Sequence, residues 1–540
     1  MSCRRWLVLA SLAVLGCGTA DGGDTTVVIA AGGDADVALP LMSALTQSRE
    51  YSDLMFDKLA DIGDAQNTIG DAGYQPRLAA SWTWAPDSMS ITFHLDARAR
   101  WHDGAPVRAE DVRFAFEVYT DTTVGANGGA DLAATLDSVS VVDSLTAAVW
   151  YRQRKSEQFH AVAYNLIPLP SHLLRDIPHA AIKTSEYARH PVGSGPYEFV
   201  SWEPKQRFEL RAATNGWRVK PRVARVVFTI LSDASATARA VFAGDADFTE
   251  TVSADDAAEA TKRADVKLVA LPRYEYGFIT LNTRTPDGKA PGPFFAERDV
   301  RRALTMALDR HAMVRNVYGE YAAVARGPFV RAQWVSDSTI ELLPYDTAAA
   351  ARALGAAGWT RGPDGVRTRN GRRLAFSIVV PSSSRPRIRL AEMAQQALRA
   401  VGADVAVDVV DVPTWAGRVR GHNYDASIIS LTGTPSPSGL RDVVRGGGGM
   451  NFGHYANPVV DAELDAGFSS PDVATARPHF SRAFRALADD PPAIWLYEQR
   501  LPAMARNRLV IDHSPADAWW KGIVDWDVTG PPTRGTAPNP

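Results

Sequence analysis

Cysteine is nearly absent from this 540-residue chain, which contains Cys3 and Cys17 and no other thiol. The long body after Cys17 therefore has no disulfide and no cysteine-ligated metal site. Long apolar runs are absent as well, because nothing after the N-terminal segment approaches the roughly 18 residues that a membrane-spanning helix needs. The body must be stabilised by a large hydrophobic core, and hydrophobic residues make up 46% of the chain.

An excess of charge is also missing, since the formal net charge is -3 and 22% of the residues are charged. This balance gives no basic footprint for nucleic acid. The chain contains no G-x-S-x-G elbow, no H-E-x-x-H motif and no phosphate-binding loop, and its 11 histidines include no pair at metal-ligand spacing. We therefore expect no catalytic residue, no metal and no cofactor. An exported hydrolase stays open as the less favoured alternative.

The N-terminus has the pattern of an export signal. Two arginines precede a 10-residue apolar run that is too short to span a bilayer, and the run ends at VLGC, with Cys17 last. This ending resembles a bacterial lipobox, which implies cleavage before Cys17 and lipid on its thiol. The alternative is an ordinary secretory signal that happens to contain a cysteine. Residues 1–17 would then be the signal with the lipidated cysteine, and residues 18–24 a flexible polar tether.

The stretch RWHDGAPVRAEDVRFAFEVY, residues 100–119, carries many charges without predicting catalysis. A strand over residues 91–95 precedes it, because apolar and polar residues alternate there. Asp103-Gly104 is a turn signal, so local structure explains the neighbouring His102. Glu110 and Asp111 suit the first turn of the helix that follows, where carboxylates face the positive end of the helix dipole.

Strands and helices alternate in two parts of the chain. Residues 223–231 predict a strand, followed by a helix that Asp233 or Ser235 would cap and Gly244 would end. Residues 374–380, 390–401, 405–410 and 426–431 then predict strand, helix, strand and strand. This rhythm favours an α/β fold of two lobes with partly parallel sheets and a cleft between them.

An amphipathic helix is predicted over residues 299–316. Val300, Ala303 and Leu304 begin its apolar stripe, whereas Arg301 and Arg302 lie off the stripe. We expect the arginines to form a solvated helix face, with a binding patch as the alternative.

Five sequence blocks together resemble the solute-binding lipoproteins of family 5 ABC importers, which include oligopeptide-, dipeptide- and nickel-binding proteins. The longest runs from Tyr74 to Glu117 and contains LAASW, PD, FHL and HDGAPVRAEDVRF. The others follow in the same order as in the family: PVGSGPYEFVSWEP (191–204), DVRRALTMALDRHAMV (299–314), NFGHYANPVVDAELDAG (451–467) and PPAIWLYEQ (491–499).

The resemblance implies a periplasmic-binding-protein fold with an extra subdomain in lobe I. By this resemblance, lobe I comprises residues 25–48, 190–272 and 497–540, its extra subdomain is residues 49–189, and lobe II is residues 273–496. The strand Tyr274–Leu281 and the strand near Trp495 would cross between the lobes, which would close on the ligand.

The chain departs from the peptide-binding members at a turn after residues 426–431. Those members often carry an Asp that pairs with the free α-amine of the ligand, and this chain has Thr434 at that position. A second acid that follows in those members is replaced here by Ser436. Threonine can accept a hydrogen bond but cannot neutralise an ammonium, and a buried charge needs a partner. Either another acid replaces it or the solute has no such amine, and we favour the second.

The resemblance also gives candidate ligand-binding residues in lobe II. They are Trp415, Thr432, Thr434, Arg445, Asn451 and Phe452. The glycines after Arg445 would let backbone approach a ligand, although a plain flexible loop explains them equally well. Core packing or surface exposure is an equal alternative for Trp415, Asn451 and Phe452.

The resemblance implies an exported, lipid-anchored monomer that is attached to a membrane by lipid only. It would capture a small solute or peptide and deliver it to an ABC permease. A lipoprotein that senses its ligand without transport is the alternative, and the sequence does not separate the two.

The lipid anchor can be tested by substitution. We expect Cys17→Ala to move the protein from the membrane fraction to the soluble fraction, because the thiol that would carry the lipid is lost. Cys3→Ala is the matched control and should leave the protein in the membrane fraction, as seen by immunoblotting of fractionated cells. Membrane retention of the Cys17→Ala protein would exclude the lipobox interpretation.

Overall fold

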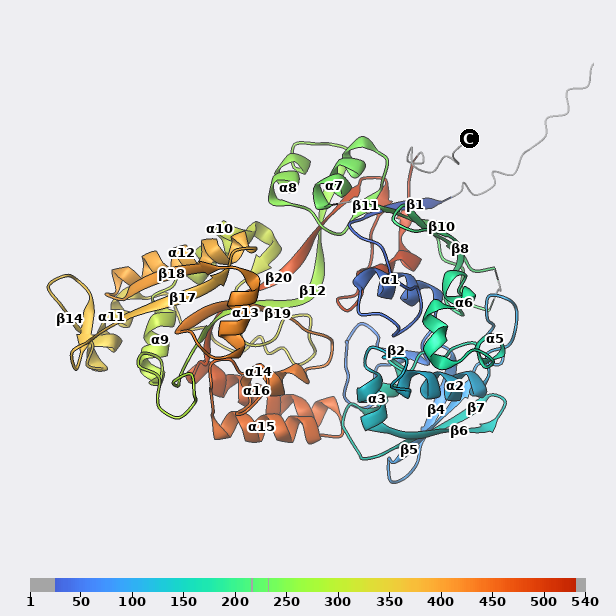
Figure 1. Ribbon diagram of the computed structural model, residues 1–540, viewed down its shortest axis with the longest axis horizontal. Helices are drawn as coiled ribbons and strands as arrows, with labels where there is room; N and C mark the ends of the chain where they lie inside the picture. The colour runs from blue at the N-terminus through green and yellow to red at the C-terminus, as the bar shows by residue number, and fades with distance from the viewer. Residues whose placement is uncertain (1–24, 215–216, 232, 531–540) are drawn as a thin grey trace, which may run out of the picture.

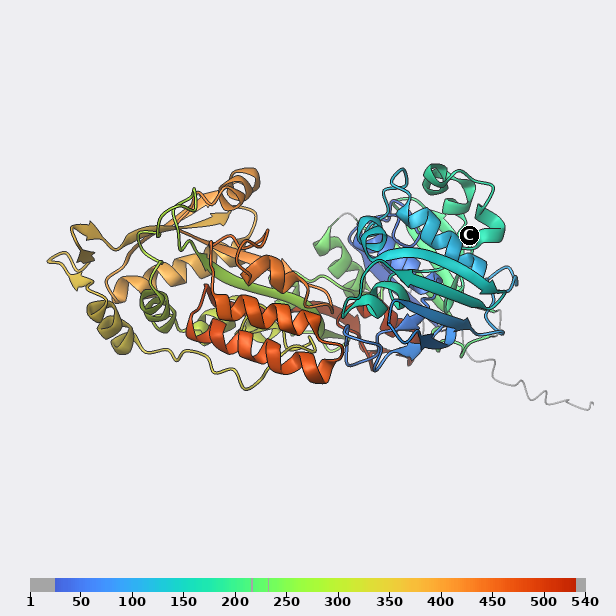
Figure 2. The same cartoon turned by 90° about the horizontal axis from the view of Figure 1, so that it is seen from below.

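The computed structural model describes residues 25–214, 217–231 and 233–530, which form two lobes side by side along the long axis (Figures 1 and 2). The predicted signal, Cys17 and the tether lie outside the described residues. Several predicted elements are confirmed, among them a parallel α/β arrangement in each lobe. The boundaries predicted for the lobes stay predictions.

The first lobe is built on β1 (Thr26–Ala31), whose six residues are all buried. It pairs in parallel with β10 (Arg225–Ile230) on one side and with β11 (Phe248–Thr249) on the other. Asp233 caps α7 through the backbone N–H of Ala236, and Gly244 ends this helix at φ 81°. The lobe also contains α1 (Thr46–Met55), β8 (Tyr197–Glu203), β9 (Arg207–Ala212), α7 (Ala234–Ala243), α8 (Ala254–Ala260), β21 (Leu509–Val510), η3 (Trp519–Asp525) and β22 (Asp527–Val528).

An extra unit in this lobe carries a four-stranded antiparallel sheet of order β4-β5-β7-β6. The charged stretch at residues 100–119 belongs here, and its charges have structural partners. The His102 ring contacts the Gly195 carbonyl at 3.0 Å, and Asp103 pairs with His172 at 2.8 Å. The elements are β2 (Ala60–Asp61), β3 (Gln75–Pro76), β4 (Ala79–Trp84), β5 (Ser90–Leu95), α2 (Ala109–Thr120), α3 (Gly129–Thr135), β6 (Leu136–Asp143), β7 (Thr146–Tyr151), α4 (Gln158–Ala163), α5 (Ser171–Leu174), η1 (His179–Thr184) and α6 (Glu186–Arg189).

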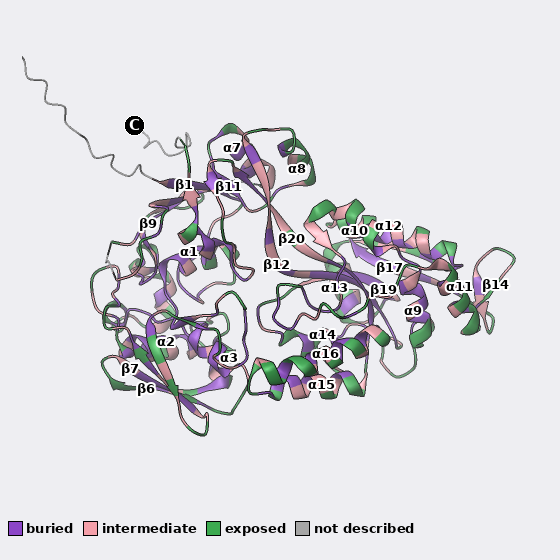
Figure 3. Cartoon of the chain, turned by 180° about the vertical axis from the view of Figure 1, so that it is seen from behind, coloured by how far each residue is buried: buried purple, intermediate pink, exposed green. Residues whose placement is uncertain are grey.

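The second lobe has β17 (Ala375–Pro381) between β18 (Asp404–Val410) and β19 (Ala426–Thr432), all parallel. Strands β17 and β19 are largely buried, while α15 exposes its outer face (Figure 3). Its other elements are α9 (Arg298–Met306), α10 (Arg310–Tyr318), η2 (Gly319–Tyr321), β13 (Ala322–Ala323), α11 (Thr347–Ala356), β14 (Thr360–Arg361), β15 (Arg367–Arg369), β16 (Arg372–Arg373), α12 (Arg385–Ala400), α13 (Val412–Arg420), α14 (Gly439–Val444), α15 (Pro458–Ser469) and α16 (Val473–Asp489).

Two long antiparallel strands, β12 (Val266–Leu281) and β20 (Ala493–Arg506), carry the chain from one lobe to the other and back (Figure 1). They join both lobes into one sheet of order β18-β17-β19-β12-β20-β11-β1-β10-β9-β8. Their pairing shifts register between Leu271 and Glu275. Pro272 lies in this break and Pro502 lies near it on the other strand, and proline cannot donate to a ladder. The strands predicted to cross between the lobes are parts of β12 and β20. The register shift lies at the start of the predicted strand Tyr274–Leu281.

The single helix predicted over residues 299–316 is wrong, because the chain forms α9 and α10 instead. Asp309 caps α10 by accepting a hydrogen bond from the Ala312 N–H, so a new helix starts there. The solvated face predicted for the arginines is also wrong for Arg301. Its guanidinium is buried and donates to the carbonyls of Phe295 and Pro491 at 2.6 and 2.8 Å.

Gly277 in β12 lies against the ring of Tyr497 in β20, and a Cβ at this glycine would overlap the ring. Tyr497 is 1% exposed and packs on Tyr318 at 4.6 Å, so it has no free space to move into. We expect Gly277→Ala to destabilise the protein by about 1–3 kcal/mol through overpacking. The change should lower Tm in differential scanning calorimetry.

Gly417→Ala is the matched control, since Gly417 lies inside α13 with nothing within 4 Å of the position of its missing Cβ. The free energy of unfolding of this variant should increase by roughly 0.5–1 kcal/mol, because alanine has a higher helix propensity than glycine. Equal Tm shifts for the two variants would contradict the steric argument.

Candidate functional site

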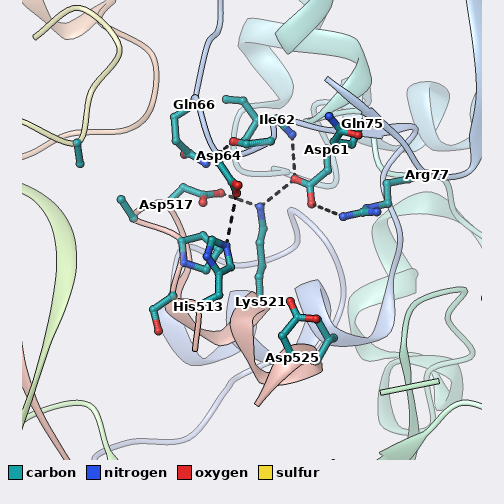
Figure 4. A pocket seen from close by; sticks show the side chains of 16 residues that line it. Asp61, Ile62, Asp64, Gln66, Gln75, Arg77, His513, Asp517, Lys521 and Asp525 are labelled. Carbon is teal, nitrogen blue, oxygen red and sulfur yellow. Dashed lines mark hydrogen bonds and ion pairs between the residues drawn. The ribbon is translucent and has the colours of Figure 1, made fainter. Parts of the chain in front are cut away.

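A pocket of about 580 Å³ lies at the junction of the two lobes (Figure 4). Its walls come from the loops around β2 and β3 and from the segment that contains η3, all in the first lobe, while Ala332 contributes from the second lobe. The segments are brought together by the C-terminal return of the chain, which places η3 beside the extra unit. The pocket is the place where a solute could touch both lobes.

Lys521 stands at the centre of the pocket wall, between Asp61 and Asp517 (Figure 4). Its Nζ lies 2.7 Å from Oδ2 of Asp517, 2.7 Å from the Tyr164 hydroxyl and 3.3 Å from Oδ1 of Asp61. Burial would lower the pKa of Lys521, but Tyr164 and the two aspartates outweigh it and raise the pKa well above its usual value. The ammonium is therefore permanently charged and fully partnered.

The two aspartates are held ionised by the same contacts. Burial alone would raise the pKa of Asp517, yet Lys521 and Lys58 outweigh it and lower the pKa to about 2. The pKa of Asp61 is lowered as well, against the effect of burial, by Lys521, Lys58 and Arg77. These carboxylates are already neutralised within the wall.

The rim of the pocket carries less firmly paired groups. Asp64 is 91% exposed and lies 3.6 Å from the His513 ring, and Asp525 is exposed. Arg77 pairs with Asp61 at 3.3 Å. The pocket therefore has a charged wall with acidic groups at its mouth. In the described part of the chain, no group of three or more His, Cys, Asp or Glu side chains could hold a metal ion.

Behind this wall lies Lys58, which is only 7% exposed. Its Nζ lies 3.8 Å from Asp53 and 3.3 Å from the centre of the Tyr164 ring. Burial dominates here and lowers the pKa of Lys58 to about 7, although Asp53 works in the other direction. Lys58 is thus the member of the network that loses its proton most readily.

Side-chain contacts also bridge the lobes next to the pocket. The Tyr274 hydroxyl donates to Oε1 of Gln66 at 2.9 Å, and Nε1 of Trp334 donates to the Thr68 hydroxyl at 3.3 Å. Directly after Thr68 in sequence, Ile69 of the first lobe is fully buried within the hydrophobic cluster of the second lobe. The loop at residues 66–69 therefore inserts into the second lobe.

Glu157 adds a polar link between the lobes. Its carboxylate accepts hydrogen bonds from the hydroxyls of Thr68 in the first lobe and Ser436 in the second, the latter at 2.8 Å. Burial raises the pKa of Glu157, and the two hydroxyls partly offset this effect. Ser436, which replaces the later family acid, thus serves as a partner for an acid from the other lobe.

The candidate residues from the sequence do not line this pocket, and their role in binding stays a prediction. Thr432 ends β19 and pairs with Glu275 of β12. Thr434 lies next to it, and its carbonyl accepts from Nε2 of Gln333 at 2.9 Å. The structure therefore brings both threonines to the crossing strands, close to the loops that join the lobes.

The other candidates lie apart and have structural partners. Nε1 of Trp415 donates to the Ser427 hydroxyl at 3.0 Å. Arg445 pairs with Asp465 at 3.0 Å, and the amide of Asn451 donates to the carbonyls of Arg445 and Tyr455. The Phe452 carbonyl accepts from the Tyr424 hydroxyl and contacts the His422 ring at 2.9 Å. These contacts explain the residues without a ligand.

Sequence reasoning missed Lys521, Asp517 and Asp61. The only local signal is the four-residue spacing of Asp517 and Lys521, which is too common to single them out. Asp61 lies 460 residues from Lys521, so no local pattern could pair them.

Comparisons with known proteins agree on one family. A family profile described as bacterial extracellular solute-binding proteins, family 5 middle, matches residues 73–452. Relatives include protein XP55 of Streptomyces lividans, 28% identical over 86% of this chain and 82% of its own length. The oligopeptide-binding protein AppA of Bacillus subtilis (strain 168) is 24% identical over 88% of this chain and 86% of its own.

Solved structures share the fold. AppA from Bacillus subtilis in complex with a nonapeptide has a TM-score of 0.67 at 22% identity, covering 94% of this chain and 99% of its own. HbpA2 from Haemophilus parasuis has a TM-score of 0.79 at 20% identity, covering 93% and 100%. NikZ from Campylobacter jejuni in complex with Ni(L-His) has a TM-score of 0.69 at 21% identity, covering 93% and 99%. The two-lobed α/β fold predicted from the sequence is thereby confirmed.

The low pKa of Lys58 predicts a specific pH dependence. Between about pH 7 and its ordinary value of 10.5, Lys58 is neutral in the folded protein and charged in the unfolded chain. The unfolded state then binds more protons, so Lys58 makes stability rise with pH by up to about 1.4 kcal/mol per pH unit. Lys58→Met removes this rise, and its stability relative to the wild type should fall from pH 7 toward pH 10.

Urea unfolding near the two ends of this pH range measures the free energy of unfolding of the variant relative to the wild type. Lys262→Met is the matched control, because Lys262 is exposed beside Glu259. Its free energy of unfolding relative to the wild type should be the same at both pH values. If the Lys58→Met difference were also constant, Lys58 would be titrating as an ordinary lysine.

Proposed function

The chain belongs to the family 5 bacterial extracellular solute-binding proteins, and from this premise we propose that it captures a solute between its two lobes and delivers it to an ABC permease. The relatives named above include an oligopeptide-binding protein, and the solved structures include AppA with a nonapeptide and NikZ with Ni(L-His). The binding site proposed here is the junction of the lobes, with the pocket around Lys521 as one part of it.

The observation that carries the proposal is the way in which the lobes are joined. The described chain passes between them through β12 and β20, and the ladder of these strands is interrupted where Pro272 lies. Strands that lose pairing at one point can bend there while each lobe keeps its own core, which is how hinge closure works. A pocket with walls from both lobes would then change shape as the lobes rotate.

The solute is proposed to lack a free α-amine. The buried carboxylates of the pocket, Asp61 and Asp517, are already paired with Lys521. Thr434 carries no charge, and its hydroxyl donates to the Ser436 carbonyl at 3.3 Å. A buried ammonium would find no free carboxylate among these groups, although AppA was solved with a nonapeptide. A blocked or cyclic peptide, or a polar small molecule, fits this arrangement better.

We further propose that Cys17 carries a lipid anchor and that the protein works as a monomer outside the cytoplasm. Family 5 binding proteins are extracytoplasmic. The helices within the described residues are each too short or too polar to cross a membrane. Attachment through lipid would keep the protein near its permease, and two acyl chains or more make such an anchor stable. Sensing without transport stays the alternative.

Native mass spectrometry of protein purified gently from its own source tests the binding function. An added mass that is lost on denaturation would show a retained solute and identify its class. Residue-level protection of the crossing strands in hydrogen exchange, with and without that solute, would show whether the lobes close on it. A solute that protects only one lobe would contradict the proposed site.

The proposal on the amine predicts the preference between two probes. We expect N-acetyl-tri-alanine to bind at least as tightly as tri-alanine in calorimetric titrations, because the buried carboxylates are already paired and an ion pair with the exposed Asp64 or Asp525 adds little in water. Thr434→Asp should shift the preference toward tri-alanine by about tenfold or more, since a charge-assisted pair is worth roughly 1.5–3 kcal/mol. Thr432→Asp is the control for added charge. Sub-micromolar binding of tri-alanine to the wild type would exclude the proposal.

A further inference from the structure

One segment of the second lobe concentrates positive charge. Residues 351–402 contain ten arginines and two acids, so they carry a formal charge of +8. Because the whole chain carries -3, the rest of it carries -11. The charge is therefore strongly divided between this segment and the remainder of the protein, which the near-neutral total conceals.

Part of this segment forms the outer end of the second lobe, namely α11, the three-stranded sheet of β14, β15 and β16, and the C-terminal end of α12. The segment also contains β17 and the N-terminal end of α12, where Arg387 donates to the Ser430 hydroxyl of β19. In Figure 1, β14 and α11 lie at one extreme of the long axis. Strand β1, where the described chain begins, lies in the other lobe.

Two arginines of the segment hold the small sheet in place. Arg367 is buried and donates to the carbonyls of Trp359, Ala351 and Val401 at 2.6, 2.9 and 2.7 Å. Arg369 bonds Glu297 at 3.0 Å and lies over the Trp359 ring at 5.4 Å. The end of the lobe is thus a rigid platform rather than a loose loop.

Five other arginines face solvent on this platform and are named here the basic tip: Arg352, Arg361, Arg372, Arg373 and Arg399. Arg373 pairs with Asp364 and lies 3.7 Å from Asp404, and Arg361 donates to the Ala400 carbonyl at 2.8 Å. Over the ranges that the structure describes, Arg352, Arg372 and Arg399 have no acidic partner within salt-bridge distance. Their charge is therefore not neutralised by an acidic side chain of the described residues.

We infer that the basic tip binds an anionic membrane surface through phospholipid headgroups. Arginine matches phosphate through two parallel N–H donors. The five side chains come from four different elements, α11, β14, β16 and α12, and expose their charge at the end of the lobe, which suits many headgroups in a plane better than one small anion. Each Arg beside an anionic bilayer increases binding about fivefold, so several act strongly together.

The position of the basic tip gives this contact a function. If the proposed lipid on Cys17 holds the chain on the N-terminal side of β1, attachment at the basic tip adds a second point in the other lobe. The long axis would then lie along the membrane, with both lobes near a permease. The lipid contact of the tip does not depend on the proposed anchor, whereas the orientation rests on it.

The test uses the processed chain, residues 18–540, made without lipid, so that the anchor does not contribute. Co-sedimentation is measured with vesicles of phosphatidylcholine, with and without phosphatidylglycerol. We expect binding only to vesicles with phosphatidylglycerol, and loss of binding in about 1 M salt, where the Debye length is about 3 Å. The triple variant Arg352→Gln, Arg372→Gln and Arg399→Gln should reduce partitioning at least about tenfold.

A matched triple variant removes the same charge from the first lobe: Arg154→Gln, Arg189→Gln and Lys220→Gln. These side chains are also exposed, and within the described residues none has an acidic partner in salt-bridge distance. They lie far from the basic tip, so binding should change by less than about twofold if contact rather than net charge drives it. Thermal unfolding of both variants verifies that the fold is intact.

Equal losses in the two triple variants would overturn the inference, because net charge alone would explain the binding. Absence of binding to phosphatidylglycerol vesicles would overturn it too, and binding to polyglutamate instead would assign the basic tip to an acidic protein. Release from vesicles by inorganic phosphate at low ionic strength would reduce the site to one for small anions. None of these outcomes bears on solute binding at the junction, which native mass spectrometry tests separately.

Discussion

The pairing of β12 with β20 is the constraint on which the rest of the structure depends. These two strands continue one sheet from the first lobe into the second, and they are the places where the described chain crosses. Pro272 cannot donate a hydrogen bond to the ladder, so the pairing of β12 with β20 is interrupted there. This interruption, here called the joint, lies between the hydrophobic cores of the two lobes. Because each lobe has its own buried cluster, bending at the joint costs little packing. Both the pocket and the possibility of closing it follow from this arrangement.

Contacts beside the joint limit how the lobes can move. Ile69 is buried in the core of the other lobe, and Glu157 accepts hydrogen bonds from both sides of the interface. A buried carboxylate with hydroxyl partners is more easily protonated than one paired with a cation, which the raised pKa of Glu157 reflects. Contacts of this kind would act as a pivot around which the rest of the junction opens, while the charges at Lys521 stay locked together.

Charge is used in two different ways at the two ends of the molecule. Around Lys521 the acids and bases are buried and neutralise one another, so they shape a polar wall without leaving a free charge for the solute. At the basic tip, three of the five arginines have no acidic partner among the described residues, and Arg367 anchors the small sheet beside them. The proposed function requires a pocket that selects the solute and an outer surface that orients the protein on the membrane. The paired charges around Lys521 suit the first requirement, and the basic tip suits the second.

The sequence by itself determined the family and most of the strands and helices, because alternation, capping residues such as Asp233 and family blocks are local patterns. The export signal lies outside the described residues and stays a prediction. The sequence could not decide that residues 299–316 break into two helices at Asp309, or that Arg301 is buried against Pro491. The tertiary structure alone decided the pocket, since Lys521 meets Asp61 across 460 residues of chain. Such pairs depend on how whole elements pack, and the energy of one distant contact leaves no periodic trace in the sequence.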